Sequence, residues 1–162
     1  MNISASQEQK FRALLGGIDA DRRTLRMKEY IQHGSTSTYD HCIAVARMSY
    51  RIRCRLSVPM RDRELVRGAV LHDYFLYDWH SYRGPLHGYH HAETALQNAV
   101  RDFEDLTPCE KDIIRSHMWP LNLFCVPHCR EALVVCLADK LVSAGETLRR
   151  RSRIHRTAGD AV

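Results

Sequence analysis

The sequence predicts an all-α protein, a single-domain helical bundle of about six or seven helices. Apolar residues recur at steps of three and four along most of the chain, which is the spacing of a buried helix face. The sustained alternation and the Asn-Gly turns that indicate β-hairpins are not found. The 162 residues can bury one substantial core, and 44% apolar with 27% charged residues is typical of a globular protein.

Two N-terminal helices are expected, over residues 5–16 and 21–32, and Gly16-Gly17 separates them. Residues 34–38 then form a loop that ends in a helix N-cap signal, and the next helix runs from about Thr38 to Leu56. Its apolar line has steps of four, three, four and four and consists of His41, Val45, Met48, Ile52 and Leu56. His41 therefore faces inward at the start of this helix.

The following helix ends in an informative pair of residues, His72-Asp73. Asp62 is expected to cap its N-terminus, and its two buried lines are formed by Leu65, Val66, Ala69 and Val70. His72 and Asp73 extend these lines, so both should face the core. A buried carboxylate needs a partner because its desolvation is costly, and a metal ion bound by both residues would be one. From this pair alone, an ordinary hydrogen-bonded histidine and a capping aspartate fit equally well.

Residues 77–88 break the helical periodicity with clustered Tyr, Trp, His, Gly and Pro, and predict a loop beside this pair. The next helix begins near two adjacent histidines. His91 aligns with an apolar line made of Ala95, Ala99 and Phe103. His90 aligns with a polar line made of Thr94, Gln97 and Arg101. Periodicity therefore directs His91 inward and His90 outward.

Two further helices complete the bundle. The first starts at Thr107-Pro108-Cys109-Glu110, a capping box with proline at the first helical position, and carries His117 on its apolar face. The last is expected over residues 128–150. One of its faces is formed by Ala132, Val135, Cys136, Asp139 and Val142. Asp139 is thus a second carboxylate inside an apolar stripe.

Six inward-facing residues on five of these helices predict a metal centre. Each one alone could be an ordinary buried, hydrogen-bonded side chain, but together they are hard to bury except around metal. They are His41, His72, Asp73, His91, His117 and Asp139. Nitrogen and oxygen ligands favour Mn, Fe, Co, Ni or Zn ions. Six ligands exceed the needs of one open site, and a dinuclear centre bridged by one carboxylate would use them all.

The order of these six residues resembles the HD-domain superfamily of metal-dependent phosphohydrolases, over about residues 36–145. The His-x-x-x-Ala-Leu run from His91 and the Ala-Asp-Lys run at 138–140 belong to the resemblance. It implies that Asp73 bridges two ions, and that His91 and His117 are the extra pair of dinuclear members. The core quartet would be His41, His72, Asp73 and Asp139.

One departure lies at Asp73-Tyr74-Phe75-Leu76, where many members of the superfamily have Asp-Ile-Gly-Lys. This difference argues against the branch that acts on cyclic dinucleotides. It also leaves the catalytic acid and the substrate contacts open.

The resemblance implies hydrolysis of a phosphate ester or anhydride of a small molecule, with nucleotides among the candidates. Two divalent ions would activate a water whose pKa is lowered toward ~7. Asp73 would belong to the catalytic centre, and Lys140 would bind phosphate at its rim unless it is simply solvated. Asp78 or His80 could protonate the leaving group, and ordering the loop is an equally good role for them.

Two other functions fit the same sequence. A dinuclear-iron oxygenase could use the same six ligands on the same scaffold. A non-catalytic regulatory or binding module could instead use the arginine-rich C-terminus, although the complete ligand set argues against it.

The chain is expected to divide into residues 1–35, which pack on the core, a metal-binding domain over 36–148 and a basic, disordered tail over 149–162. The tail holds five arginines against one aspartate, so it carries most of the net charge of +5. Few aromatic residues interleave these arginines, so nucleic acid is not expected as a partner. The expected partner is a small phosphorylated substrate, and a homo-oligomer is left open.

The six cysteines include no Cys-x-x-Cys pair and do not suggest a disulfide framework. Cys125 and Cys129 flank a turn and give only a weak zinc signal. No apolar run approaches the ~18 residues of a membrane span, and the N-terminus lacks the apolar core of a signal peptide. We therefore expect a reduced, cytoplasmic protein that does not associate with membranes.

Overall fold

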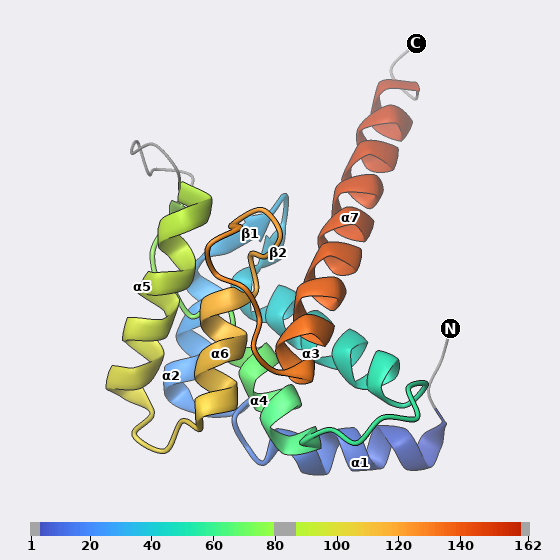
Figure 1. Ribbon diagram of the computed structural model, residues 1–162. Coiled ribbons are helices and arrows are strands. Elements are labelled where there is room, and N and C mark those ends of the chain that lie inside the picture. The colour runs from blue at the N-terminus through green and yellow to red at the C-terminus, as the bar shows by residue number, and fades with distance from the viewer. Residues whose placement is uncertain (1–3, 80–86, 160–162) are drawn as a thin grey trace.

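The computed structural model describes residues 4–79 and 87–159, and in this part of the chain seven α-helices carry almost all of the regular structure (Figure 1). The predicted all-α class is confirmed. The regular strands in this part are β1 (Ile31–His33) and β2 (Thr36–Ser37), an antiparallel pair with Ile31 opposite Ser37. No helix within the described residues is long and apolar enough to cross a membrane.

The N-terminal segment differs in part from the prediction. Helix α1 (Ala5–Leu15) begins at a Ser4 capping box and ends where Gly16 adopts a left-handed backbone with φ of 57°. The prediction of one continuous helix over residues 21–32 is wrong. The chain forms the short α2 (Arg22–Leu25) and a 3-10 turn (Arg26–Glu29), and then enters β1.

The β1–β2 hairpin explains this difference. Its hydrogen bonds pair backbone N–H and C=O groups that would otherwise have been paired within a longer helix. Thr38 donates its N–H to the Tyr30 carbonyl at 2.8 Å, and Gly34 makes the reversal with φ of 63°. The positive φ at Gly34 suits a residue without a side chain. The hairpin therefore delivers the chain directly to the N-terminus of the next helix.

Helices α3 (Thr38–Arg53) and α4 (Asp62–Leu71) pack against each other in the core. Ser37 caps α3 by accepting the N–H of Asp40 at 3.1 Å, as the sequence suggested. Asp62 is the first residue of α4 rather than its cap. Its carboxylate instead accepts from Arg53 at 2.5 Å and from Lys10 at 3.0 Å, so it ties α4 to α3 and α1.

Helices α5 (His87–Asp102), α6 (Pro108–Ser116) and α7 (Arg130–Gly159) complete the bundle. The capping box predicted for α6 is confirmed, with Thr107 and Glu110 each accepting a backbone N–H of the other. Helix α7 continues beyond its predicted end near residue 150, so the segment expected as a disordered tail is helical to Gly159.

The length of α7 follows from its composition. Between Gly145 and Gly159 the sequence has neither glycine nor proline, and arginine is a good helix former. Figure 1 shows the C-terminal half of α7 projecting away from the other helices. The division of the chain into three parts stays a prediction.

Helices α4 and α6 approach closely at Gly68. A Cβ atom at this position would lie 2.6 Å from Cδ1 of Ile113 and 3.2 Å from its Cβ. Ile113 is fully buried, so it has little room to move. Because His72 follows α4 and His117 follows α6, this contact helps to set the distance between the two histidines.

We predict that Gly68→Ala lowers the free energy of unfolding by about 1–3 kcal/mol, because the added methyl overpacks the contact with Ile113. Gly145→Ala is the matched control, since a Cβ there meets nothing within 4 Å. It should raise stability by up to about 1 kcal/mol through helix propensity. Urea unfolding with chelator present measures both changes, and an equal effect of the two substitutions would contradict the packing argument.

Candidate metal centre

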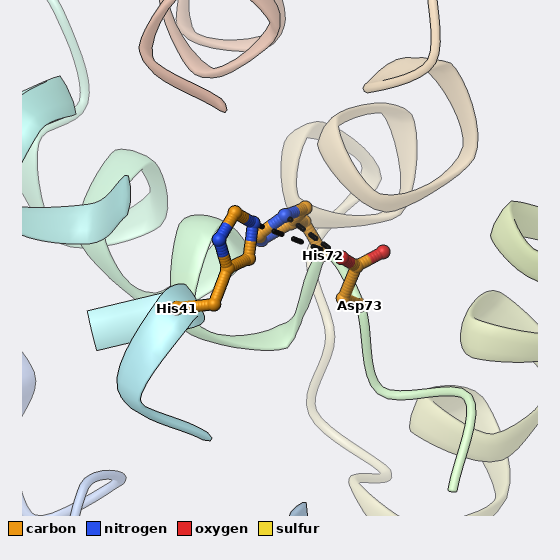
Figure 2. A group of neighbouring side chains, drawn as sticks. All are labelled: His41, His72 and Asp73. Carbon is orange, nitrogen blue, oxygen red and sulfur yellow. Dashed lines mark ion pairs between the residues drawn. The ribbon is translucent and has the colours of Figure 1, made fainter. Parts of the chain in front are cut away.

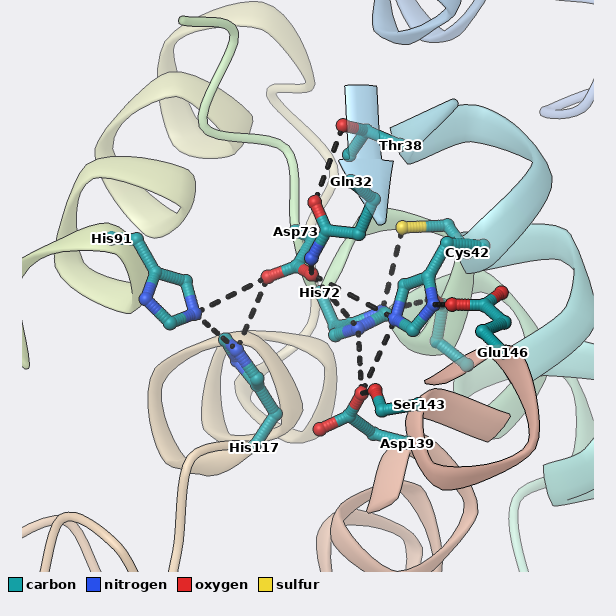
Figure 3. Close-up of polar contacts among 12 residues, drawn as sticks. Gln32, Thr38, Cys42, His72, Asp73, His91, His117, Asp139, Ser143 and Glu146 are labelled. Atoms are coloured by element: carbon teal, nitrogen blue, oxygen red, sulfur yellow. Dashed lines mark hydrogen bonds and ion pairs between the residues drawn. The ribbon is translucent and has the colours of Figure 1, made fainter. Parts of the chain in front are cut away.

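The six residues predicted to bind metal converge at one buried place (Figures 2 and 3). None of them is more than 9% exposed. They come from the start of α3, the residues that follow α4 and α6, the N-terminal half of α5, and α7. In chain order they are His41, His72, Asp73, His91, His117 and Asp139.

One group consists of His41, His72 and Asp73, drawn in Figure 2, and their candidate ligand atoms all lie within 4.8 Å of one another. The Oδ2 atom of Asp73 is 3.9 Å from Nε2 of His41 and 3.5 Å from Nε2 of His72. Asp139 joins this group, with its Oδ1 at 3.2 Å from Nε2 of His41 and 4.0 Å from Nε2 of His72. These four residues are those that the sequence resemblance assigned as the core quartet.

A second group consists of Asp73, His91 and His117. The Nε2 atoms of the two histidines are 2.9 Å apart, and they lie 3.4 and 3.2 Å from Oδ1 of Asp73. Asp73 thus presents Oδ2 to the first group and Oδ1 to the second. This is the arrangement that a bridging carboxylate between two metal ions requires.

The buried imidazoles are oriented as metal ligands. His72 donates its Nδ1 proton to the Ala69 carbonyl at 2.7 Å, and His117 donates its own to the Ile114 carbonyl at 2.8 Å. With the proton on Nδ1, the Nε2 lone pair is available toward the centre. Burial lowers the pKa of His72 to about 4, so its imidazole is neutral at neutral pH, as a ligand must be.

Two buried polar atoms of the centre, Nε2 of His72 and Oδ1 of Asp73, have no hydrogen-bond partner. Such atoms are rare in protein interiors because leaving them unsatisfied costs free energy. A metal ion would satisfy both, since each is a free electron pair rather than a donor. The donor set therefore fits divalent metal.

The carboxylates around His41 attract positive charge to the first group. Burial lowers the pKa of His41, but hydrogen bonds to Asp139 and Glu146 and the nearby charge of Asp73 outweigh burial and raise this pKa to about 10. The same three carboxylates would stabilise a metal cation. A proton on Nε2 of His41 and a metal ion bound there are thus alternatives for one position.

Two residues of the site were missed by the sequence prediction. Glu146 accepts from Nδ1 of His41 at 3.1 Å, a carboxylate–histidine pair that orients the ring. Gln32 on β1 donates from Nε2 to Oδ2 of Asp73 at 2.7 Å. Glu146 follows Asp139 by seven residues, so helical spacing could have identified it. Gln32 gave no signal, because its segment was predicted as helix.

A cavity of about 280 Å³ lies beside the centre. Its walls combine residues of both metal groups with apolar side chains, namely Phe75, Trp79, Met118 and Leu121. Lys140 also lines the cavity, and its Nζ donates to the His117 carbonyl at 2.9 Å. Lys140 therefore lies at the rim of the cavity, the position in which it was expected to bind phosphate.

The two candidates for the catalytic acid are not assigned by this geometry. Asp78 is exposed and does not belong to the described lining of the cavity. His80 lies outside the described residues.

The helical phase predicted for α5 is confirmed, since His91 is 7% exposed and His90 faces solvent.

We predict that His91→Ala lowers the metal content from two ions per chain toward one, because the second group would keep only Asp73 and His117. His90→Ala, the adjacent exposed control, should leave the content unchanged. Elemental analysis of protein purified without chelators measures both. Loss of metal from the His90 variant alone would mean that the second group does not bind an ion.

A further prediction concerns Glu146, which we expect to act through His41. Glu146→Gln should weaken metal affinity by about 10- to 100-fold without unfolding the protein, because outer partners of ligand histidines have effects of this size. Glu93→Gln, an exposed glutamate on α5, is the control. Metal titration against a competing chelator measures the affinity, and equal affinities for both variants would exclude the orienting role.

A family model described as HD domain matches residues 38–144, which is more than half of the chain and includes all six residues of the metal centre. No curated protein and no solved structure matches the chain significantly.

Proposed function

The chain belongs to the HD domain family, and we propose that it is a metal-dependent phosphohydrolase that cleaves a phosphate ester or anhydride of a small molecule. The family consists mostly of metal-dependent hydrolases, and this chain carries a complete set of buried ligands. The observation that supports the proposal best is the position of Asp73, whose two oxygens face separate histidine groups.

The first ion would be held by His41, His72, Asp73 and Asp139, and the second by Asp73, His91 and His117. Bound ions of this kind lower the pKa of a coordinated water toward ~7 and neutralise phosphate charge. The chain fixes the ligands through neighbouring groups: Gln32 holds Asp73, and backbone carbonyls hold His72 and His117. Fixed ligands need no reorganisation when substrate binds.

Lys140 supports binding of the phosphate. Its ammonium has three donors; one is used by the His117 carbonyl, and the nitrogen also lies 3.6 Å from Oδ2 of Asp139. The others can donate to phosphate oxygens in the cavity, where charge-assisted hydrogen bonds are strong. The apolar side chains of Phe75 and Trp79 then suit the part of the substrate beyond the phosphate. We propose Asp78 or His80 as the acid that protonates the leaving group.

A dinuclear-iron oxygenase is the second candidate, because the same nitrogen and oxygen ligands also suit two iron ions. The two functions differ in their products. An oxygenase consumes oxygen with its substrate, whereas a phosphohydrolase releases phosphate without oxygen. A non-catalytic module that uses the basic end of α7 would do neither.

The test is phosphate release from p-nitrophenyl phosphate and from a panel of nucleotides and sugar phosphates, after loading with each of Mn, Fe, Co, Ni and Zn. We expect turnover that a chelator abolishes and that the same metal restores. Asp73→Ala should lose both metal and turnover, and His90→Ala should keep both. Oxygen uptake by the iron-loaded protein without phosphate release would favour the oxygenase instead.

A further inference from the structure

A second cluster of reactive side chains lies at the other end of α6 from His117. The Sγ atoms of Cys109, in the first turn of α6, and Cys129, just before α7, are 3.3 Å apart. Both cysteines are free, and Cys109 is 3% exposed, whereas Cys129 is partly exposed. The pair is thus in contact without a covalent bond, and one of its members is accessible.

The two thiols have different acidities. Cys129 occupies the N-cap position of α7, where helix amides favour a negative charge. The hydrogen bond from Cys109 lowers the pKa of Cys129, and the amide of Ala132 adds to this, while burial and the Asp112 carboxylate oppose it. The same hydrogen bond, together with burial, raises the pKa of Cys109. Cys129 is also the more exposed member of the pair, so it is the thiol that a small disulfide reaches first, whereas Cys109 is buried.

A cavity of about 430 Å³ gives access to the pair. Besides both cysteines, three cationic side chains line it, those of Arg61, Lys111 and Arg115. Asp112 also lines the cavity and adds a negative charge, and Arg61 is paired with Glu131, so the excess positive charge comes from Lys111 and Arg115. The positive charge of the cavity suits small molecules that carry carboxylates.

Glu131 completes a group with the two cysteines that could hold a metal ion, but this use of the thiols is less favourable. The Glu131 carboxylate accepts from the backbone N–H of Arg61 at 2.8 Å and from its Nη2 at 3.1 Å. A metal ion would have to displace this arginine from a buried carboxylate. The weak zinc signal of Cys125 and Cys129 is not supported either, because Cys125 accepts from Asn122.

We propose that Cys129 and Cys109 form a redox-active dithiol, in which Cys129 is the nucleophile and Cys109 the resolving thiol. The oxidant is a small disulfide that carries carboxylates, such as oxidised glutathione. Closing the pair requires the sulfur atoms to approach from 3.3 Å to about 2.05 Å, a shift of about 1.2 Å. The product links the first turn of α6 covalently to the residue just before α7.

The exchange takes place in two steps that balance. The Cys129 thiolate attacks one sulfur of the small disulfide, whose S–S bond breaks, and the leaving thiolate takes up a proton. Cys109 then gives up its proton and attacks the Cys129 sulfur, which releases the second small thiol. The two protein thiols are oxidised to one disulfide, and the small disulfide is reduced to two thiols.

The test treats the full chain with oxidised glutathione, alkylates the remaining thiols and maps the peptides by mass spectrometry. In the wild type we expect a Cys109–Cys129 linked peptide that dithiothreitol removes. Cys109→Ser should instead accumulate glutathione on Cys129, because the resolving thiol is missing. Cys129→Ser should form neither product.

Cys125→Ser is the matched control, since Cys125 is also partly exposed but has no cysteine neighbour in the structure, and it should form the disulfide like the wild type. The wild-type peptide map needs no substitution, so it tests the proposal even if a variant folds poorly. Glutathione on Cys54 or Cys125 with Cys129 unmodified would overturn the proposal. Stoichiometric zinc that protects Cys109 and Cys129 from alkylation would overturn it too.

Discussion

The burial of the Asp73 carboxylate is the constraint on which the rest of the site depends. Burial alone would raise the pKa of Asp73, yet the neighbouring imidazoles hold it well below its usual value, so the carboxylate is ionised at 2% exposure. An isolated charge in this position would be very costly. The groups around it come from segments far apart in the chain: Gln32 of the hairpin donates to Oδ2, and Nε2 of His117, at the end of α6, lies 3.2 Å from Oδ1. The helices therefore have to meet at Asp73 for the core to close.

The same local hydrogen bond, from a histidine to a backbone carbonyl, occurs at the ends of two helices. The last carbonyls of a helix lack partners within the helix and must be satisfied in another way. At the ends of α4 and α6, His72 and His117 each donate Nδ1 to the carbonyl three residues earlier. One hydrogen bond thus satisfies the helix end and fixes the tautomer of an imidazole in the candidate metal centre. The orientation of both imidazoles is in this way set by the local backbone.

Periodicity was sufficient to predict most of the bundle and the burial of the six candidate ligands, because each of those side chains lies on or directly after a helix whose buried face repeats regularly. His91 and Asp139 are examples, since both continue an apolar line. The hairpin could not be predicted, since strands of two and three residues are too short to show alternation, and Gln32 was missed with it. The contact between Cys109 and Cys129 joins two segments that no periodic pattern relates.

Helix α7 directs three polar side chains toward the candidate metal centre from one face, namely Asp139, Ser143 and Glu146. Ser143 donates to Asp139 at 3.2 Å, and Glu146 accepts from His41. Seven residues advance a helix by almost two full turns, with a drift of only about 20°. Insertion or deletion of a single residue between Asp139 and Glu146 would turn one of them away by about 100°. Relatives that retain this metal site should therefore vary freely in side chains along the outer face of α7 but keep the length of this segment constant.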